Sequence, residues 1–288
     1  MALNIETFKT RALTALVFVV IMLGGLLYNQ WSFLALFTLV HFGCWVEYQK
    51  LVGLIDKEYQ QVNSFHQYGV MLAGFGFVLF MLNDTYSIGN FKLHELGWWM
   101  IVLAAIALPI VEVLFSKKPN AKLIVHSFLG LVYISLSWGL MMNLRDMPTG
   151  LIVPLVLIAS IWINDTMAYI VGSFIGKTPL SKISPKKTWE GTIGGAVLAI
   201  VVVGIVMSNI DTSTINSSVK LPNYHWYVIA AIGAIVGTLG DLLESKLKRL
   251  ANVKDSGSFM PGHGGFLDRF DSLILATPFV WLYLRLVL

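Results

Sequence analysis

Nine long apolar runs dominate the sequence and limit the folds open to it. Each approaches the roughly 20 residues that an α-helix needs to cross about 30 Å of hydrocarbon. Only 12% of the 288 residues are charged, about half the share usual in soluble domains, which excludes an ordinary soluble fold. We therefore expect an all-α polytopic membrane protein with about nine transmembrane helices. The runs cover residues 12–28, 31–46, 67–82, 97–115, 123–142, 149–171, 192–209, 224–240 and 271–288.

Basic residues are distributed unevenly among the segments that connect these runs. If the N-terminus is cytoplasmic, 16 of the 20 Lys and Arg residues lie on the cytoplasmic side. This asymmetry is the one that the positive-inside rule describes, and it predicts a cytoplasmic N-terminus. The first run follows Lys9 and Arg11 and lacks an Ala-x-Ala-like cleavage site, so we interpret it as a retained anchor.

An aspartate interrupts the sixth run. Asp165 follows Asn164 in the stretch IWINDTMAYIVGSFIG, and a carboxylate at this depth in lipid should face a polar cavity. A helix-packing face with one interhelical hydrogen bond explains the pattern equally well. At helical spacing, the residues on the same face as Asp165 are Tyr169, Gly172, Ser173 and Gly176.

The loop that follows, residues 176–191, contains four lysines and a single acidic residue, Glu190. Two prolines prevent it from forming a continuous helix. Such a loop could anchor the protein to anionic lipid headgroups, and this reading is favoured when the loop is taken alone. It could equally bind a polyphosphate, for which Lys provides a compact point charge. The lysines are Lys177, Lys182, Lys186 and Lys187.

Three aspartates, Asp165, Asp241 and Asp268, each lie where an apolar run meets a loop predicted to be cytoplasmic. Clustered carboxylates repel one another unless they are protonated, paired with cations or bound to a metal. A few hard oxygen ligands with open positions for substrate phosphates suit Mg²⁺. A network of ion pairs with Lys and Arg and no metal is the alternative, and the spacing of the charges alone favours it. In the apolar first half, we interpret Glu47 and Glu112 as snorkelling or structural carboxylates.

A glycine-rich turn, Pro-Gly-His-Gly-Gly, precedes the last run at residues 261–265. Glycine permits positive φ and close backbone approach, and successive N–H groups in such turns form anion-binding nests. Asp268, Asp271 and Ser272 follow at helical spacing and add an acidic face. The combination suggests a metal–nucleotide site. In such a site His263 would donate a hydrogen bond to phosphate or carry a proton; the alternative is a plain turn residue.

The stretch from Ser245 to Ser272 combines S-K-L-K-R, K-D, P-G-H-G-G and D-R-x-D-S. Together these motifs resemble the C-terminal pattern of the phosphatidate cytidylyltransferases, also called CDP-diacylglycerol synthases. The upstream segments N-D-T-x-A-Y, I-S-P-K-K-T-W-E-G and G-D-L-x-E-S resemble the same family. The similarity covers roughly residues 150–288.

The resemblance implies that CTP and phosphatidate are converted to CDP-diacylglycerol and pyrophosphate, with Mg²⁺ as cofactor, in phospholipid biosynthesis. It assigns metal binding to Asp165, Asp241 and Asp268. It assigns catalytic roles to Asp241, Asp268, Lys248, Arg249 and His263. It assigns substrate binding to Lys177, Ser184, Lys186, Lys187, Ser245, Lys254, Gly264, Gly265 and Arg269.

One substrate lies in lipid and the other in water, so we expect the site at the cytoplasmic face of a bacterial inner membrane. Residues 1–150 would be a scaffold of transmembrane helices that could admit lipid. Residues 151–288 would form the catalytic transmembrane region, with cytoplasmic loops 176–191 and 245–271. Besides CTP, phosphatidate and the membrane, we expect a second copy in a homodimer as a partner, and no nucleic acid.

The strongest alternative is an ion- or solute-coupled transporter, with Asp165 and Asp241 as coupling residues inside the membrane. The sequence shows no obvious internal repeat, and its charges are densest in the loops, so both features disfavour transport. A related enzyme that uses another lipid phosphate or nucleotide is the second alternative.

Overall fold

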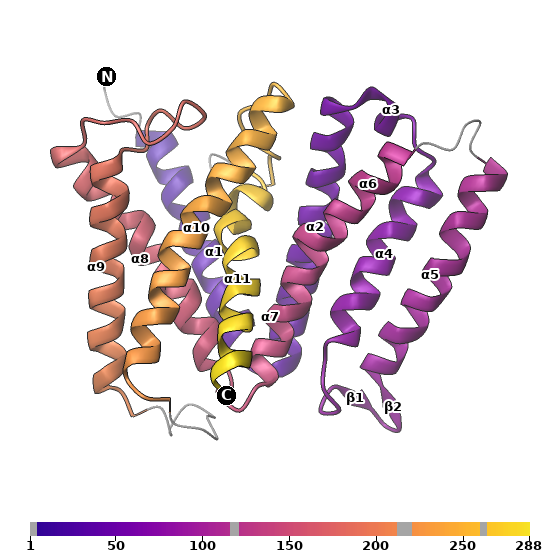
Figure 1. Ribbon diagram of the computed structural model, residues 1–288, viewed down its shortest axis with the longest axis horizontal. Helices are drawn as coiled ribbons and strands as arrows, with labels where there is room; N and C mark the ends of the chain where they lie inside the picture. The colour runs from indigo at the N-terminus through magenta and orange to yellow at the C-terminus, as the bar shows by residue number, and fades with distance from the viewer. Residues whose placement is uncertain (1–4, 116–120, 212–220, 260–263) are drawn as a thin grey trace. The chain divides into compact units, whose positions relative to one another are not determined.

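The computed structural model describes residues 5–115, 121–211, 221–259 and 264–288, and most of them are helical (Figure 1). The elements in chain order are α1 (Ile5–Leu27), α2 (Gln30–Ile55), α3 (Lys57–Gln60), α4 (Ser64–Phe80), β1 (Ser87–Ile88), β2 (Phe91–Lys92), α5 (Leu93–Phe115), α6 (Ala121–Gly130), the π-helical turn η1 (Leu131–Ser135), α7 (Leu136–Asp146), α8 (Ile152–Ile175), α9 (Trp189–Asn209), α10 (Tyr224–Leu250) and α11 (Leu267–Val287).

Every apolar run of the sequence lies mainly within a helical segment of the described chain. Within the described residues, six segments are long and apolar enough to cross a membrane, and two shorter apolar helices cover Leu13–Leu27 and Ser64–Phe80. The prediction of an all-α polytopic membrane protein is therefore confirmed. The six long segments are Leu93–Leu114, Lys122–Asp146, Ile152–Ile175, Trp189–Asn209, Tyr224–Leu250 and Leu267–Val287.

The chain divides into two compact units. Unit 1 comprises Met1–Gly139 and Leu250–Phe270, and unit 2 comprises Leu140–Arg249 and Asp271–Leu288. The segment Leu250–Phe270 thus belongs with the N-terminal helices, although more than a hundred residues of sequence separate it from Gly139.

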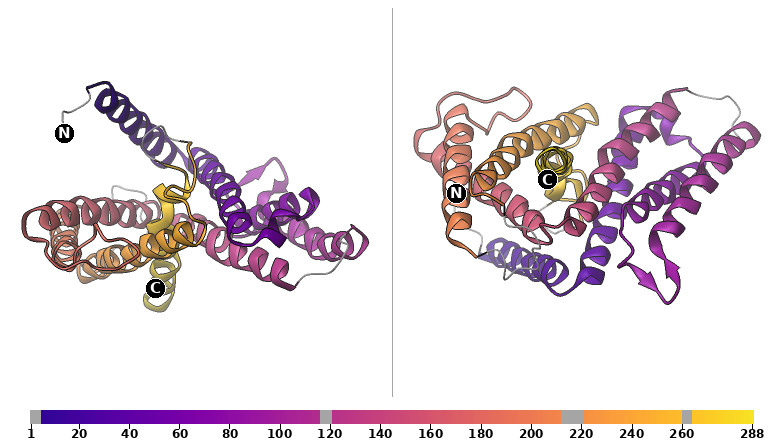
Figure 2. Two further views of the ribbon diagram at one scale, coloured as in Figure 1. Left: turned by 90° about the horizontal axis from the view of Figure 1, so that it is seen from above. Right: turned by 60° about the horizontal axis from the view of Figure 1, so that its bottom comes forward.

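In unit 1, α4 and α5 lie side by side and are joined through the short antiparallel pair β1–β2 (Figures 1 and 2). Gly97 of α5 is in contact with the backbone of α4, where a β-carbon would overlap Phe80. Small residues at such crossings allow helices to approach closely in a membrane. Large aromatic side chains, including Phe37, Trp45 and Trp138, fill the interior of the unit.

In unit 2, α8 and α9 lie side by side (Figures 1 and 2) because Gly191 and Gly195 of α9 pack directly against Ala168 of α8. Gly233 and Gly237 of α10, which lie four residues apart and so on one face of the helix, also pack closely against α8. A β-carbon at Gly233 would meet Ser160 of α8 at 3.1 Å, and one at Gly237 would meet Ile161 at 3.3 Å.

The loop between α8 and α9 folds back on itself. Leu180 N–H donates to the Lys187 carbonyl (2.7 Å), and Trp189 N–H donates to the Thr178 carbonyl (2.9 Å). Thr188 caps α9 by accepting from Gly191 N–H at 3.2 Å. These bonds fix the part of the loop that contains Lys186 and Lys187.

Candidate active site

A polar cavity of about 340 Å³ lies in unit 2, where α8, α10 and the loop before α9 meet. It contains two of the aspartates and two of the lysines that the sequence analysis selected. The face predicted from helical spacing on α8 is largely confirmed, because Asp165, Tyr169, Gly172 and Ser173 all line the cavity. The other lining residues are Asn164, Ala168, Lys186, Lys187, Thr188, Thr192, Thr238 and Asp241.

Asp241 is held from two directions. Its carboxylate forms an ion pair with Lys187, and Ser245 Oγ, one helical turn further along α10, donates to Oδ1 at 3.2 Å. The side chains of Lys187 and Asp241 are 28% and 26% exposed, so water reaches the pair. The ion pair fixes which of the four loop lysines approaches the carboxylate, which the sequence left open.

Asn164 places an amide in the same cavity. Its Nδ2 donates to Thr238 Oγ1 at 3.4 Å, whereas its buried Oδ1 has no hydrogen-bond partner among the described residues. A buried acceptor without a partner is unfavourable, so this oxygen is suited to a ligand. In the sequence, Asn164 is marked only by its position next to Asp165.

The oxygen atoms of this cavity fit Mg²⁺. Within the part of the chain that the structure describes, no group of three or more His, Cys, Asp or Glu side chains is arranged to hold a metal ion. Mg²⁺ does not need one, because it usually binds through one or two carboxylates and takes its other ligands from water and substrate phosphates. Asp165, Asp241 and the Asn164 amide oxygen are ligands of this kind.

Asp271 is a further acidic residue of unit 2 that the sequence analysis did not assign to a metal. It is 7% exposed and lies within range of the charges of Asp241, Asp165 and Lys187. Its Oδ1 accepts from Ser272 N–H at 2.6 Å, and Gly240 of α10 packs against its backbone. The signal that could have found it is its position in the D-R-x-D-S motif.

A separate polar cluster lies in unit 1 and contains Asp268. Asp268 Oδ2 accepts from Ser256 N–H (2.8 Å), Ser256 Oγ (2.9 Å) and Gly265 N–H (2.8 Å). Two backbone donors and a hydroxyl therefore fix this carboxylate in the first turn of α11.

Glu47 of α2 forms the buried side of the same cluster. It is 7% exposed and accepts from Ser256 Oγ (2.7 Å), Phe266 N–H (2.9 Å) and Leu267 N–H (2.9 Å). The interpretation of Glu47 as a structural carboxylate holds, but its partners could not be read from the sequence. We call the set Glu47, Ser256, Gly265, Phe266, Leu267 and Asp268 the Glu47–Asp268 cluster.

Glycines make room for this cluster. A β-carbon at Gly257 or Gly265 would overlap the Glu47 carboxyl group. Gly264 has φ +83°, and a β-carbon there would lie 2.5 Å from Asp268 Oδ2. The predicted glycine conformation is confirmed at Gly264.

The remaining predicted site residues divide between the units. In unit 2, Lys248 forms an ion pair with the fully buried Glu244, and Arg249 is exposed near the end of α10. Lys177 N–H donates to Glu190 Oε2 (3.2 Å), and the Ser184 carbonyl accepts from Lys187 N–H (3.1 Å). In unit 1, Lys254 and Arg269 are exposed. His263 lies outside the described residues.

Comparison with known proteins finds that residues 9–287 match the model of the cytidylyltransferase family. A phosphatidate cytidylyltransferase of Synechocystis sp. is 42% identical over 50% of this chain and 47% of its own length. The enzyme of that name from Bacillus subtilis is 38% identical over 55% and 57%. The one from Staphylococcus saprophyticus is 29% identical over 94% and 96%. The chain thus aligns with about half the length of the first two relatives and nearly all of the third.

Proposed function

The chain belongs to the cytidylyltransferase family, and from this premise we propose that it transfers the cytidylyl group of CTP to phosphatidate. The products are CDP-diacylglycerol and pyrophosphate. The relatives named above support these substrates, since each is named a phosphatidate cytidylyltransferase.

The observation that carries the proposal is the unit 2 cavity, which combines Lys186 and Lys187 with Asp165 and Asp241. Transfer of a nucleotidyl group from a nucleoside triphosphate needs cationic groups against the phosphates and carboxylates that can share a divalent cation with them. A cavity of about 340 Å³ falls in the usual range for small-ligand sites, about 300–1,000 Å³.

In the proposed reaction, an oxygen of the phosphatidate phosphate attacks the α-phosphorus of CTP. The bond from that phosphorus to the oxygen bridging to the β-phosphate breaks, and pyrophosphate leaves with the electron pair. Such transfers depend mainly on positioning and charge neutralisation. Lys186 and Lys187 would neutralise phosphate charge, and the bond network of the loop keeps Lys187 beside Asp241.

We propose that Asp165, Asp241 and Asn164 Oδ1 hold Mg²⁺, which when bound would neutralise negative charge on the substrate phosphates. The assignment of Asp268 to the metal stays a prediction of the sequence, as do the substrate contacts of Lys177, Ser184, Ser245, Lys254, Gly264, Gly265 and Arg269 and the catalytic roles of Lys248, Arg249 and His263.

We further propose nine membrane crossings with a cytoplasmic N-terminus, and an active site at the cytoplasmic face of a bacterial inner membrane. The charge asymmetry of the connecting segments and the bacterial relatives support this arrangement. Protease access to tags at the two ends tests it, because nine crossings leave the ends on opposite sides. The homodimer stays a prediction, which light scattering in detergent would test.

The test of the function is incubation of the purified protein with CTP, phosphatidate and Mg²⁺. We expect CDP-diacylglycerol and pyrophosphate in equal amounts, and no product when EDTA removes the metal. Asp241→Asn and Asp165→Asn should lower the rate about 100-fold or more, the scale seen when electrostatic stabilisation is lost. Asp211→Asn, an exposed aspartate just after α9, is the matched control. Absence of product together with solute flux into liposomes would instead support a transporter.

A further inference from the structure

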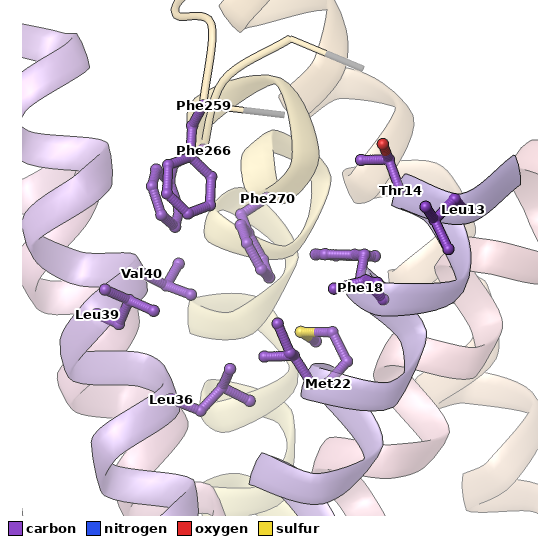
Figure 3. Close-up of a pocket in the computed structure, with 12 residues that line it drawn as sticks. Leu13, Thr14, Phe18, Met22, Leu36, Leu39, Val40, Phe259, Phe266 and Phe270 are labelled. Carbon is purple, nitrogen blue, oxygen red and sulfur yellow. The ribbon is translucent and has the colours of Figure 1, made fainter. Parts of the chain in front are cut away.

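A second cavity, of about 350 Å³, lies within unit 1 between α1, α2 and the segment that leads into α11 (Figure 3). Its wall is apolar apart from Thr14. α1 contributes Phe18 and Met22, α2 contributes Leu36 and Val40, and the C-terminal segment contributes Phe266 and Phe270. A cavity with such a wall stays dry and favours an apolar ligand.

The two ends of the cavity differ, because one of them lies next to polar groups of unit 1. Figure 3 shows Phe259 and Phe266 at one end and Met22 and Leu36 at the other. The Phe266 N–H is bonded to Glu47, so the first end adjoins the Glu47–Asp268 cluster. A ligand with a polar head and an apolar tail would be oriented by this difference.

The length of the cavity matches one leaflet of a bilayer. Its lining on α1 runs from Leu13 to Met22. At 1.5 Å per residue this is about 13 Å, close to half of the roughly 30 Å hydrocarbon core. Val17 and Leu39 line the cavity and are also 48% and 53% exposed, so the cavity opens beside them to the surroundings of the helices. A lipid chain could enter there from the bilayer.

We propose that this cavity binds one acyl chain of the phosphatidate substrate, with the glycerol end of the chain toward Phe259 and Phe266. The proposal rests on the proposed function, because a diacyl lipid substrate supplies the chain. Phe266 and Phe270 flank Asp268 in sequence, so the cavity wall and the carboxylate belong to one short segment. The cavity would discriminate between phosphatidates by the length of the acyl chain, because its wall has a single hydroxyl group for polar recognition.

Val17→Trp fills the cavity from its exposed side, and Val20→Trp is the matched control. Both residues are valines on α1, and Val20 is 61% exposed and does not line the cavity. The measurement is kcat/KM for dioleoyl and for dihexanoyl phosphatidate. We expect Val17→Trp to lower the preference for dioleoyl phosphatidate about 15-fold, the effect of excluding two methylene groups at roughly fourfold each. Val20→Trp should keep the wild-type preference.

An unchanged preference in folded Val17→Trp would overturn the proposal. A second measurement on the wild type does not depend on that variant folding. Phosphatidate with a photoreactive group in its acyl chain should label the α1 and α2 peptides that line the cavity, and unlabelled phosphatidate should compete. Equal labelling by photoreactive phosphatidylethanolamine would indicate a resident structural lipid and overturn the proposal.

A wild type inactive on both lipids would count against the proposed function, whereas an active wild type without selective labelling would count against the acyl site alone.

Discussion

Glu47 of α2 accepts a hydrogen bond from Ser256 Oγ at 2.7 Å, although 209 residues separate them in sequence. The same hydroxyl lies 2.9 Å from Asp268 Oδ2. A serine hydroxyl has one proton, so it donates to one of the two carboxyl groups at a time. Glu47 thus acts on the position of Asp268 through Ser256, Phe266 and Leu267, and is a positioning residue.

We predict that Glu47→Gln lowers the free energy of unfolding by about 2 kcal/mol, because the amide group turns one buried acceptor into a donor facing a backbone N–H. The kcat of the folded variant should fall, because Glu47 holds Asp268 in place through Ser256, Phe266 and Leu267. KM for CTP is measured beside it. Thermal unfolding in detergent and steady-state kinetics measure the two effects.

Glu58→Gln is the control, because Glu58 is an exposed glutamate of the same unit and should change neither quantity. A Glu47→Gln variant with reduced stability but wild-type kcat would leave Glu47 with a purely structural role. Asp268→Asn, which we predict to lose nearly all turnover while it stays folded, is the reference variant.

Gly264→Ala should have a larger effect on the protein than the backbone strain of a positive φ alone would produce. Gly264 and Gly89 both have positive φ, +83° and +62°, so alanine at either position costs roughly 1–2 kcal/mol. At Gly264 the new methyl group would also lie 2.5 Å from Asp268 Oδ2, whereas at Gly89 nothing lies within 4 Å. We predict that only Gly264→Ala lowers the rate, by about 100-fold, because it displaces the carboxylate. Equal activity of the two variants would show that the position of Asp268 is not critical.

The helices could be predicted from sequence because each apolar run is itself the signal. Their ends could not, since helices continue where the apolar run stops. α2 extends to Ile55, beyond the limit of its apolar run at 46. Polar residues that form part of a helix, such as Glu47 and Lys50, are invisible to an apolar window.

The composition of the candidate site could be predicted, but its pairings could not. Asp165, Lys187 and Asp241 follow from residue type, spacing and the family motifs. Which lysine meets Asp241, and which donors hold Glu47, depend on tertiary folding between segments far apart in the chain. Asn164 was recognised only as a neighbour, because an unpartnered amide oxygen is a property of the folded cavity.

We predict that Lys187→Ala raises KM for CTP about tenfold, the scale of one hydrogen bond to a charged group. Stability should change by less than about 1 kcal/mol, because both members of the Lys187–Asp241 pair are partly exposed. Lys182→Ala is the control, since Lys182 is an exposed lysine of the same loop and does not line the cavity. Steady-state kinetics with varied CTP would count against the assignment if the two variants had the same KM.

Lys248 was predicted from sequence to act on the nucleotide, and its ion pair with Glu244 adds an effect on folding. The Glu244 side chain is fully buried and that of Lys248 is 12% exposed. Removing one member of a buried ion pair is strongly destabilising, so Lys248→Ala should lower the free energy of unfolding by about 3 kcal/mol. Lys246→Ala, at an exposed position of the same helix, should leave stability unchanged.

The double variant Lys248→Ala/Glu244→Gln separates the two roles of Lys248. It also removes the buried charge of Glu244, so most of the lost stability should return, whereas a defect in CTP dependence should persist if the lysine also contacts phosphate. Thermal unfolding and KM for CTP of the three variants decide the outcome. Recovery of both quantities would limit Lys248 to neutralising Glu244, and recovery of neither would show that the Lys248–Glu244 pair is not what stabilises this end of α10.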